Sequence, residues 1–294
     1  MKLATYTNTH VADPRVGVVM NASLIDVSAA VPDMLTLIEG GAELLLAVAQ
    51  LVRNASPEQY IPLDHVRLLA PIPRPRKNMV CLGKNYAAHA AETARALQRP
   101  EKIPTDPIFF TKSVTAINHP DGSIPYDPAI STQIDWEVEL AFIIGQRGKN
   151  ISSDEAMSYV FGYTIFNDIS ARDLQSQHRQ FFKGKSLDGT APMGPWIVTP
   201  DEIDNPHGLS LHLRVNGQIK QQGQTSDMIF TIPKIIAILS HGMTLEPGDI
   251  VATGTPDGVG MAMDPPEYLQ PGDTIEAEIE QIGVLRNTIG TPQS

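Results

Sequence analysis

The spacing of apolar and polar residues predicts short strands along most of the chain and few helices. Near the N-terminus, short apolar runs predict strands at 2–7, 16–20 and 23–27. One longer stretch, 32–54, predicts a helix. Farther along, runs rich in β-branched and aromatic side chains predict strands at 78–82, 107–112, 136–144 and 159–167.

Turn signals divide these runs and favour antiparallel pairing. Asn216-Gly217 lies between two strand-like runs, and this dipeptide is typical of a two-residue hairpin turn. Short helices are expected over 85–97 and 234–240. Strands and helices do not alternate in the regular order that a doubly wound parallel sheet needs. The pattern therefore predicts an α+β fold whose larger part is an antiparallel or mixed β-roll.

A proline-rich segment divides the chain into two parts. Pro71, Pro73 and Pro75 alternate with other residues, and such a run fits neither a helix nor a central strand. We expect an extended connector at this point. The sequence therefore predicts a small N-terminal α+β domain over 1–70 and a larger, mostly β domain over 71–294.

Composition and charge narrow the class of protein. Hydrophobic residues make up 42% of the 294 positions, enough for a full core and too many for a disordered chain. The formal net charge of −11 disfavours nucleic-acid binding, which needs clustered Lys and Arg to neutralise phosphates. No apolar run approaches the roughly 18 residues of a membrane-spanning helix.

The single cysteine and the N-terminus carry information about location. Cys81 has no second cysteine to pair with, and its apolar neighbours indicate a small buried side chain. The N-terminal residues contain no apolar signal segment. We therefore expect a cytoplasmic protein with no nucleic-acid or membrane partner.

Two glutamates in one apolar strand form the first candidate site. Glu137 and Glu139 are two positions apart in the run 136–144, so their side chains share one face of the strand. Neighbouring carboxylates repel each other unless a cation lies between them, and the hard ions Mg²⁺, Mn²⁺ and Ca²⁺ prefer oxygen ligands. The same spacing also fits a solvated strand face.

Asp168 is a third carboxylate with two open interpretations. It follows the apolar strand expected over 159–167. At the exit of that strand it can reach a site at the edge of the sheet. It can equally act as the N-cap of a helix that covers 170–177, which is an ordinary role for aspartate.

A histidine and a glutamate on one predicted helix form the second candidate site. His89 and Glu92 are three positions apart in the helix over 85–97, so they lie on the same face. A carboxylate beside an imidazole orients the ring and raises its basicity, as in a general base. A surface His–Glu pair has the same spacing.

Two glycine-containing loops carry further polar residues. Lys185 follows Gly184, but the segment lacks the earlier glycine of a phosphate-binding loop, which leaves a surface cation as the plain interpretation. Thr255 lies in the glycine-rich segment 253–260. The N–H groups and the hydroxyl of such a loop can hold an anion, or the loop can be no more than a tight turn.

In their order along the chain, these segments resemble the motifs of the fumarylacetoacetate hydrolase family. Gly83-Lys-Asn-Tyr-Ala-Ala-His89 resembles the family's lid motif, and Trp136-Glu137-Val-Glu139-Leu resembles its metal-binding strand. Asn167-Asp168-Ile-Ser-Ala-Arg172-Asp173 resembles the segment with the third ligand. Gly184-Lys185-Ser-Leu-Asp188 and Thr253-Gly-Thr255-Pro-Asp-Gly-Val-Gly260 complete the set, which extends over about 80–289.

The resemblance implies a fold, a cofactor and a substrate class. It implies a β-roll catalytic domain that is usually a homodimer and acts on small anionic 2-oxo or 1,3-dicarbonyl acids. It implies Mg²⁺ or Mn²⁺, with Ca²⁺ as an alternative, bound by Glu137, Glu139 and Asp168. On the matching positions, His89 with Glu92 would activate water, Lys185 would stabilise developing negative charge, and Thr255 would hold the substrate carboxylate.

The reaction expected from this site is metal-dependent hydrolysis of a C–C bond in a diketo acid of the acylpyruvate or fumarylpyruvate type. Breaking that bond leaves a carbanion, which a metal ion and an ammonium group stabilise as an enolate. Decarboxylation, isomerisation or hydration of a related oxo acid is the alternative reaction. A non-catalytic module that binds oxo acids or metal is the alternative outside enzymes. Segment 94–106 should border the pocket and influence this choice.

Overall fold

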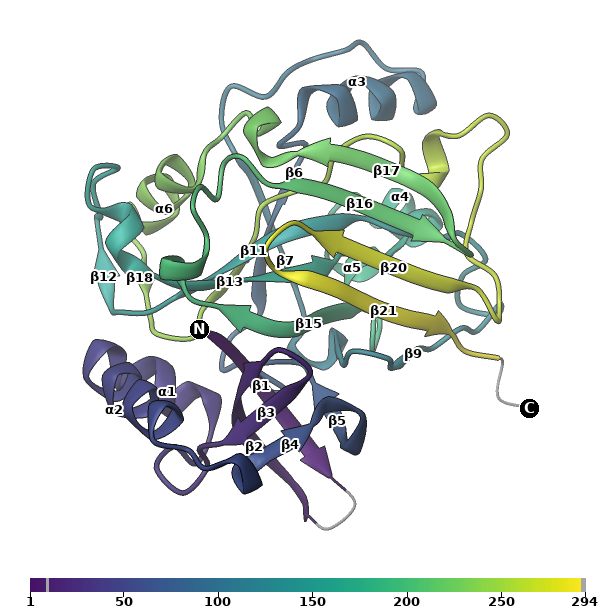
Figure 1. Cartoon of the computed structure of the whole chain (residues 1–294). Helices are drawn as coiled ribbons and strands as arrows, with labels where there is room; N and C mark the ends of the chain where they lie inside the picture. The colour runs from purple at the N-terminus through teal and green to yellow at the C-terminus, as the bar shows by residue number, and fades with distance from the viewer. Residues whose placement is uncertain (9–10, 292–294) are drawn as a thin grey trace.

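The computed structural model describes residues 1–8 and 11–291 and contains two large β-sheets (Figure 1). The larger sheet has 12 strands. Along its main path they are β4 (Tyr60–Pro62), β3 (Ser23–Asp26), β2 (Val11–Met20), β1 (Lys2–Asn8), β15 (Ala191–Val198), β13 (Val160–Asn167), β11 (Val138–Ile144), β19 (Ile250–Ala252), β6 (Met79–Gly83) and β7 (Ile108–Lys112). β5 (Val66–Leu69) pairs with β1, and β8 (Ile117–Asn118) pairs with β15.

The second sheet has five strands and two short strand pairs accompany it. Its strands are β17 (Gln218–Gln224), β16 (Ser210–Val215), β20 (Thr274–Ile279), β21 (Gly283–Ile289) and β9 (Ser123–Ile124). The pairs are β10 (Ile134–Asp135) with β14 (Ser170–Ala171), and β12 (Gly148–Lys149) with β18 (Thr244–Leu245). The turn between β16 and β17 has φ of 50° at Asn216 and 79° at Gly217, which confirms the predicted hairpin.

The main core lies between the two sheets. Val138 and Leu140 of β11 pack in one buried cluster with Leu211 and Leu213 of β16. The alternate residues of β11, among them Ile143, face the other side of the larger sheet and belong to a second cluster. This alternation follows from the pleat of the strand. The α+β fold with a mostly β-roll larger part is confirmed.

The N-terminal part contains two helices where the sequence predicts one. They are α1 (Met34–Glu39) and α2 (Gly41–Arg53), and Gly41, the first residue of α2, has φ of 53°, a left-handed conformation that interrupts the predicted helix. β1 pairs antiparallel with β15, so one sheet connects the two predicted domains. Their separation at residue 70 stays a prediction. Figure 1 shows this part at one end of the molecule.

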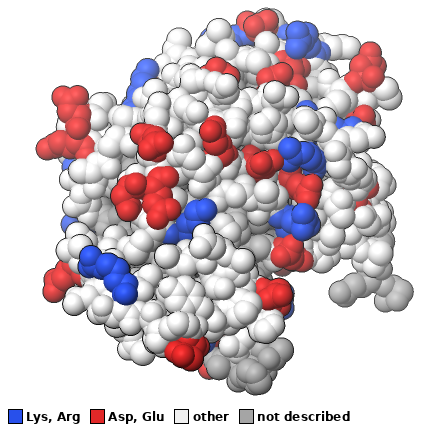
Figure 2. Space-filling model, in the orientation of Figure 1, with Lys and Arg blue, Asp and Glu red and all other residues white. Residues whose placement is uncertain are grey.

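Within the described part of the chain, four further α-helices follow α2, and they include elements that carry the candidate site. They are α3 (Ala87–Ala96), α4 (Arg172–Gln177), α5 (Phe182–Lys185) and α6 (Ile232–Ser240). α3 lies at the end of the molecule opposite the N-terminal part (Figure 1). Among the described residues, no helix is both long enough and apolar enough to span a membrane. On the face in Figure 2, Asp and Glu are interspersed with Lys and Arg.

Candidate active site

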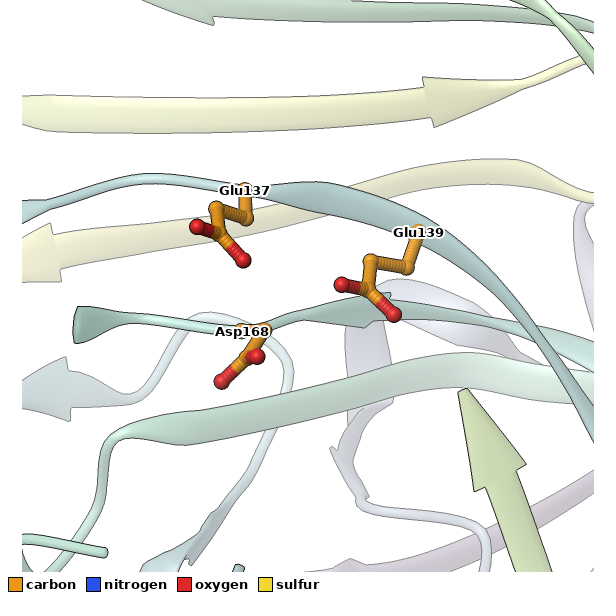
Figure 3. A group of neighbouring side chains, drawn as sticks. All are labelled: Glu137, Glu139 and Asp168. Atoms are coloured by element: carbon orange, nitrogen blue, oxygen red, sulfur yellow. The ribbon is translucent and has the colours of Figure 1, made fainter. Parts of the chain in front are cut away.

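Three carboxylates lie together where two neighbouring strands begin or end. Glu137 directly precedes β11, Glu139 is its second residue, and Asp168 directly follows β13. These strands pair antiparallel with Val138 opposite Asn167, so the ends that carry the carboxylates meet. Figure 3 shows the three side chains pointing toward one another. One oxygen of each lies within 4.8 Å of the others.

The burial of these carboxylates excludes two interpretations that the sequence leaves open. Glu137 is 4% exposed and Glu139 is 1% exposed, so the solvated strand face is wrong. Asp168 is 0% exposed and helix α4 has Ala171 at its N-cap, so the helix-cap interpretation is also wrong. Carboxylates at such depth require charged or hydrogen-bonding partners.

Three buried cations supply partners for two of the carboxylates. Lys185 donates hydrogen bonds of 2.7 Å to Oε2 of Glu137 and to Oδ2 of Asp168. Lys112 donates to Oδ1 of Asp168 at 2.7 Å, and Arg172 donates to Oε1 of Glu137 at 2.7 Å. Lys185 is 2% exposed, so its interpretation as a surface cation is wrong.

The surroundings of Glu137 and Glu139 shift the pKa values of these two carboxylates in opposite directions. Burial alone would raise the pKa of Glu137, but the positive charges of Lys185 and Arg172 outweigh it and lower that pKa from 4.5 to about 2. The pKa of Glu139 is raised well above its ordinary value by burial and by the negative charges of Asp168 and Glu137. Glu139 is therefore the carboxylate whose charge the chain itself compensates least.

The donor set at Glu139 fits a divalent metal ion. Its Oε2 accepts a hydrogen bond from the N–H of Gly254 at 2.8 Å, whereas its buried Oε1 has no partner among the described residues. An unpartnered buried oxygen costs free energy that a cation would recover. Two glutamates and one aspartate offer only oxygen ligands, as Mg²⁺ and Mn²⁺ prefer.

The charge balance of the buried groups also fits a divalent cation. Around the triad, the carboxylates Asp135, Glu137, Glu139 and Asp168 outnumber the cations Lys112, Arg172 and Lys185 by one, while the buried Glu92 is paired separately with His89. Addition of a divalent ion changes the formal charge of this cluster from negative to positive. A positive cluster at the base of a site favours an anionic ligand.

Two glycines in the segment 253–260 place backbone N–H groups within hydrogen-bond distance of carboxylates of the site. Gly254 has φ of 91° and donates its N–H to Glu139, while Gly258 has φ of 98° and donates its N–H to Oε2 of Glu92 at 2.9 Å. A Cβ added at Gly258 would lie 2.1 Å from the carbonyl oxygen of Lys220. Glycine is required there by both the conformation and the close approach.

His89 and Glu92 form the pair that the helix spacing predicts, and they are buried. Nδ1 of His89 lies 2.9 Å from Oε1 of Glu92, and the two residues are 7% and 8% exposed. The surface-pair interpretation is therefore wrong. With a proton on Nδ1 shared with the carboxylate, Nε2 is left as the basic nitrogen.

A cavity of about 340 Å³ is lined by some of the candidate residues, whereas Glu92, Glu139 and Asp168 are not part of its lining. Of the residues predicted from sequence, four line it: His89, Glu137, Lys185 and Thr255. The hydroxyl of Thr255 donates to the carbonyl of Val138 at 2.9 Å and accepts from Gln221 at 2.8 Å. In this arrangement its hydroxyl proton is engaged within the protein, so a contact to a substrate carboxylate requires that bond to be exchanged.

Sequence reasoning missed three residues that organise the site. Lys112 ends strand β7 and is 0% exposed, although the sequence shows only a lysine after an apolar run. Arg172 bridges Glu137 and Asp135, with Nε 2.8 Å from Oδ2 of the aspartate. Asp135 also accepts the N–H groups of Gly260 and residue 261. Of the three, only Arg172 lies within a recognised motif; Asp135 directly precedes another, and Lys112 lies in none.

A family model matches most of the chain. The model described as "Fumarylacetoacetate (FAA) hydrolase C-terminal" covers residues 78–290. The chain therefore belongs to the fumarylacetoacetate hydrolase family, as its motifs predict. The matched region contains the three carboxylates, the His–Glu pair and all three buried cations.

Two curated relatives carry the name oxaloacetate tautomerase. The chain is 52% identical over 229 residues to oxaloacetate tautomerase YisK of Bacillus subtilis, a match that covers 78% of this chain and 74% of the relative. It is 40% identical over 298 residues to the mitochondrial oxaloacetate tautomerase Fahd2a of Rattus norvegicus, with 98% and 91% covered.

Solved structures of the family have the same fold. Fumarylacetoacetate hydrolase from Exiguobacterium antarcticum is 40% identical, with a TM-score of 0.85 and 99% of each chain covered. Maleylpyruvate hydrolase from Sphingobium sp. SYK-6, in complex with manganese(II) and pyruvate, is 29% identical, with a TM-score of 0.81 and 100% of each chain covered. The expected Mg²⁺ or Mn²⁺ is consistent with the acidic triad and with the manganese in that relative.

Proposed function

We propose that this protein is a divalent-metal-dependent enzyme that interconverts the keto and enol forms of a small 2-oxo acid of the oxaloacetate type. The relatives named oxaloacetate tautomerase support this reaction. One observation in the chain itself carries the proposal: His89, held by Glu92, lines the same cavity as Glu137 and Lys185. A base and a cation therefore face one small space beside the acidic triad.

Tautomerisation requires one proton to move and no atom to be added. In the keto-to-enol direction the C3–H bond breaks, the electron pair forms the C2=C3 double bond, and an O–H bond forms at the former carbonyl oxygen. Nε2 of His89 accepts the C3 proton, because Glu92 keeps the proton on Nδ1. The same imidazolium, or solvent, returns a proton to the oxygen.

Lys185 is placed to stabilise the negative charge that develops on this oxygen. Its ammonium has three N–H donors, and two of them bond Glu137 and Asp168. The same nitrogen lies 5.2 Å from the ring centre of Phe110, which is another residue of the cavity wall. The third donor is therefore available on the cavity side, in surroundings poor in water where its charge acts strongly.

Glu137, Glu139 and Asp168 would hold the metal ion. When bound there, Mg²⁺ or Mn²⁺ polarises a substrate carbonyl as a Lewis acid. Thr255 lines the adjacent wall and is the proposed contact for the substrate's first carboxylate.

Tautomerisation is tested by the rate at which enol oxaloacetate converts to the keto form. Purified protein with Mn²⁺ or Mg²⁺ is expected to accelerate the loss of enol absorbance over the same metal alone. His89→Gln should slow this conversion by about 100-fold, since a positioned base contributes at least that much. The Mn²⁺ affinity of this variant should stay within about twofold, because His89 is not among the three clustered carboxylates. A folded, metal-loaded protein with no acceleration would overturn the proposal.

Hydrolysis of a C–C bond in an acylpyruvate or fumarylpyruvate is the second candidate. The similarity to maleylpyruvate hydrolase favours it, and the His89–Glu92 pair is equally suited to deprotonate water. In that reaction hydroxide adds to the distal carbonyl carbon, the C–C bond breaks, and its electron pair leaves as the pyruvate enolate. Two acid products by mass, with oxygen from labelled water in one, would establish hydrolysis; enol–keto exchange leaves the substrate mass unchanged.

The homodimer and the cytoplasmic location belong to the same proposal. The dimer is expected from the family resemblance, and the location from a chain with one buried, unpaired cysteine. Light scattering of the purified protein tests the dimer directly.

A further inference from the structure

Basic residues outnumber acidic residues in the lining of the cavity. One lining residue is acidic, Glu137, whereas five are basic: Lys84, Arg99, Arg172, Arg179 and Lys185. A chain with a net charge of −11 would be expected to repel an anionic substrate. At the cavity the exposed Arg99 and Arg179 oppose this repulsion, whereas the charges of Arg172 and Lys185 are offset by the buried carboxylates that they bond.

Four of the five basic residues of the cavity fall into an inner and an outer group, and the fifth, Lys84, is half-buried. Arg172 and Lys185 are 5% and 2% exposed and lie at the acidic triad. Arg99 and Arg179 are exposed, so they mark the open end. They come from different elements, since Arg99 follows helix α3 and Arg179 follows helix α4.

The two groups also differ in their partners. Arg172 and Lys185 are bonded to the buried carboxylates. Within residues 1–8 and 11–291, the guanidinium groups of Arg99 and Arg179 have no hydrogen bond or ion pair with another side chain. These two guanidinium groups are therefore free to bind a ligand that enters the cavity.

Apolar side chains line the cavity along with these charged groups. They are Leu82, Leu97, Phe110, Phe181 and Met261. Phe110 and Phe181 contact each other edge to face, with ring centres 5.5 Å apart. The lining thus offers cations at a buried end, cations at an open end, and apolar surface for a short carbon chain.

We propose that Arg99 and Arg179 bind the second carboxylate of a short dicarboxylic 2-oxo acid and so select dianions over monocarboxylates. The inference rests on the proposed function for the reacting end, which lies at the acidic triad. A planar guanidinium can donate two parallel hydrogen bonds to a carboxylate, which suits recognition of a terminal –COO⁻ group. Segment 94–106, expected from sequence to border the pocket, contributes Arg99 to this role.

Binding of two inert acids tests the proposal without turnover. Malate and lactate share the same 2-hydroxycarboxylate end, and only malate has a second carboxylate. Titration of the Mn²⁺-loaded protein by calorimetry should give tighter binding of malate. Arg99→Gln and Arg179→Gln should each weaken malate binding by about tenfold, the effect of one charge-assisted hydrogen bond, and leave lactate binding within about twofold.

A matched control and a kinetic measurement complete the test. Arg95→Gln removes an exposed arginine of helix α3, which precedes Arg99; Arg95 does not line the cavity, so the variant should change neither affinity. With oxaloacetate, the two variants should raise KM while kcat stays within about twofold, because the reacting end is untouched. With the 4-methyl ester of oxaloacetate, which lacks the second charge, they should match the unmodified protein.

The outcomes separate this inference from the proposed function. Equal weakening of malate and lactate, or unchanged binding of both, would overturn the role of the two arginines. If oxaloacetate is not turned over but malate binding depends on Arg99 and Arg179 as stated, the reaction is wrong and dianion recognition stands. If turnover is found and the variants behave as the unmodified protein, the reaction stands and the dianion site is wrong.

Discussion

Two carboxylates in this chain, Asp26 and Glu139, lie in surroundings that compensate their negative charge to different degrees. In the N-terminal part, Asp26 accepts hydrogen bonds from Tyr6, from Arg15 and from the N–H of Ser28. Both of its oxygens therefore have donors. In the candidate active site, Glu139 has a donor on one oxygen and none, among the described residues, on the other.

The pKa values of the two carboxylates reflect this difference. Burial alone would raise the pKa of Asp26, but the hydrogen bonds from Arg15, Ser28 and Tyr6 outweigh it, so the pKa is lowered. At Glu139, burial and two negative neighbours raise the pKa, and little opposes them. A cluster whose charges are fully satisfied stabilises the fold, whereas an incompletely satisfied cluster beside a cavity is suited to bind a ligand.

Glu139→Gln gives the largest expected effect and tests whether the incompletely compensated carboxylate serves to bind a ligand. The variant removes a carboxylate oxygen from the triad, so metal-dependent activity should fall by about 1000-fold or more, the upper end of what one electrostatic group contributes. Stability should be unchanged or higher, because a neutral amide relieves the repulsion from Asp168 and Glu137. Paired assays of activity and thermal unfolding check this. Full activity, or a loss of stability that accounts for the loss of activity, would contradict it.

Lys112→Met tests whether the buried cations of the site are structural. Lys112 is 0% exposed and bonds both Asp168 and the carbonyl of Ile169, so its loss leaves buried groups without partners. Unfolding free energy should fall by about 3 kcal/mol, measured in urea. Lys77→Met is the matched control, because Lys77 bonds Asp249 at 2.9 Å near the surface. It should cost less than about 1 kcal/mol. Equal losses would show that burial is not the cause.

Gly258→Ala tests whether the hydrogen bond that supports the proposed His89–Glu92 base can be lost while metal binding is kept. The added Cβ would meet a carbonyl oxygen and displace the N–H that holds Glu92. Activity should fall by about tenfold, the lower range for loss of a group that orients a functional side chain. Mn²⁺ affinity should not change, because Gly254, not Gly258, bonds Glu139. A metal affinity that falls in parallel with activity would show that the whole loop has moved.

Asp26→Asn gives the smallest expected effect and tests whether the fully hydrogen-bonded carboxylate stabilises the fold. Because the pKa of Asp26 is lower in the folded protein than its ordinary value of 3.8, its contribution to stability is fully present above that value. The contribution is lost as the pH falls through the folded pKa. Near pH 7 the variant should be less stable by about 1 kcal/mol with unchanged activity. At about pH 3 the difference from the unmodified protein should shrink. A difference that is constant with pH would contradict the assignment.

The two neighbouring glutamates and the His–Glu pair could be predicted from the sequence because their signal is local, whereas the ligand set with Asp168 came from the family resemblance. The period of two in a strand places Glu137 and Glu139 on one face, and the helical spacing places His89 beside Glu92. The apolar run 136–144 likewise indicates the strand that became β11, although its burial on both faces was seen only in the structure. Each of these local predictions needs only residues that are close together along the chain.

The tertiary structure decided which of these local patterns are buried together and which cations accompany them. Lys112, Arg172 and Lys185 reach the carboxylates from three separate elements, and hydrogen bonds between side chains so distant in sequence leave no periodic pattern. The orientation of Arg99 and Arg179 at one cavity likewise depends on where helices α3 and α4 end in space. The sequence by itself determined which local patterns carry oxygen donors, and these donors suit Mg²⁺ or Mn²⁺. Packing decided the depth of the acidic triad, its charge balance and the shape of the cavity, because desolvation and long-range contacts exist only once the sheets have assembled.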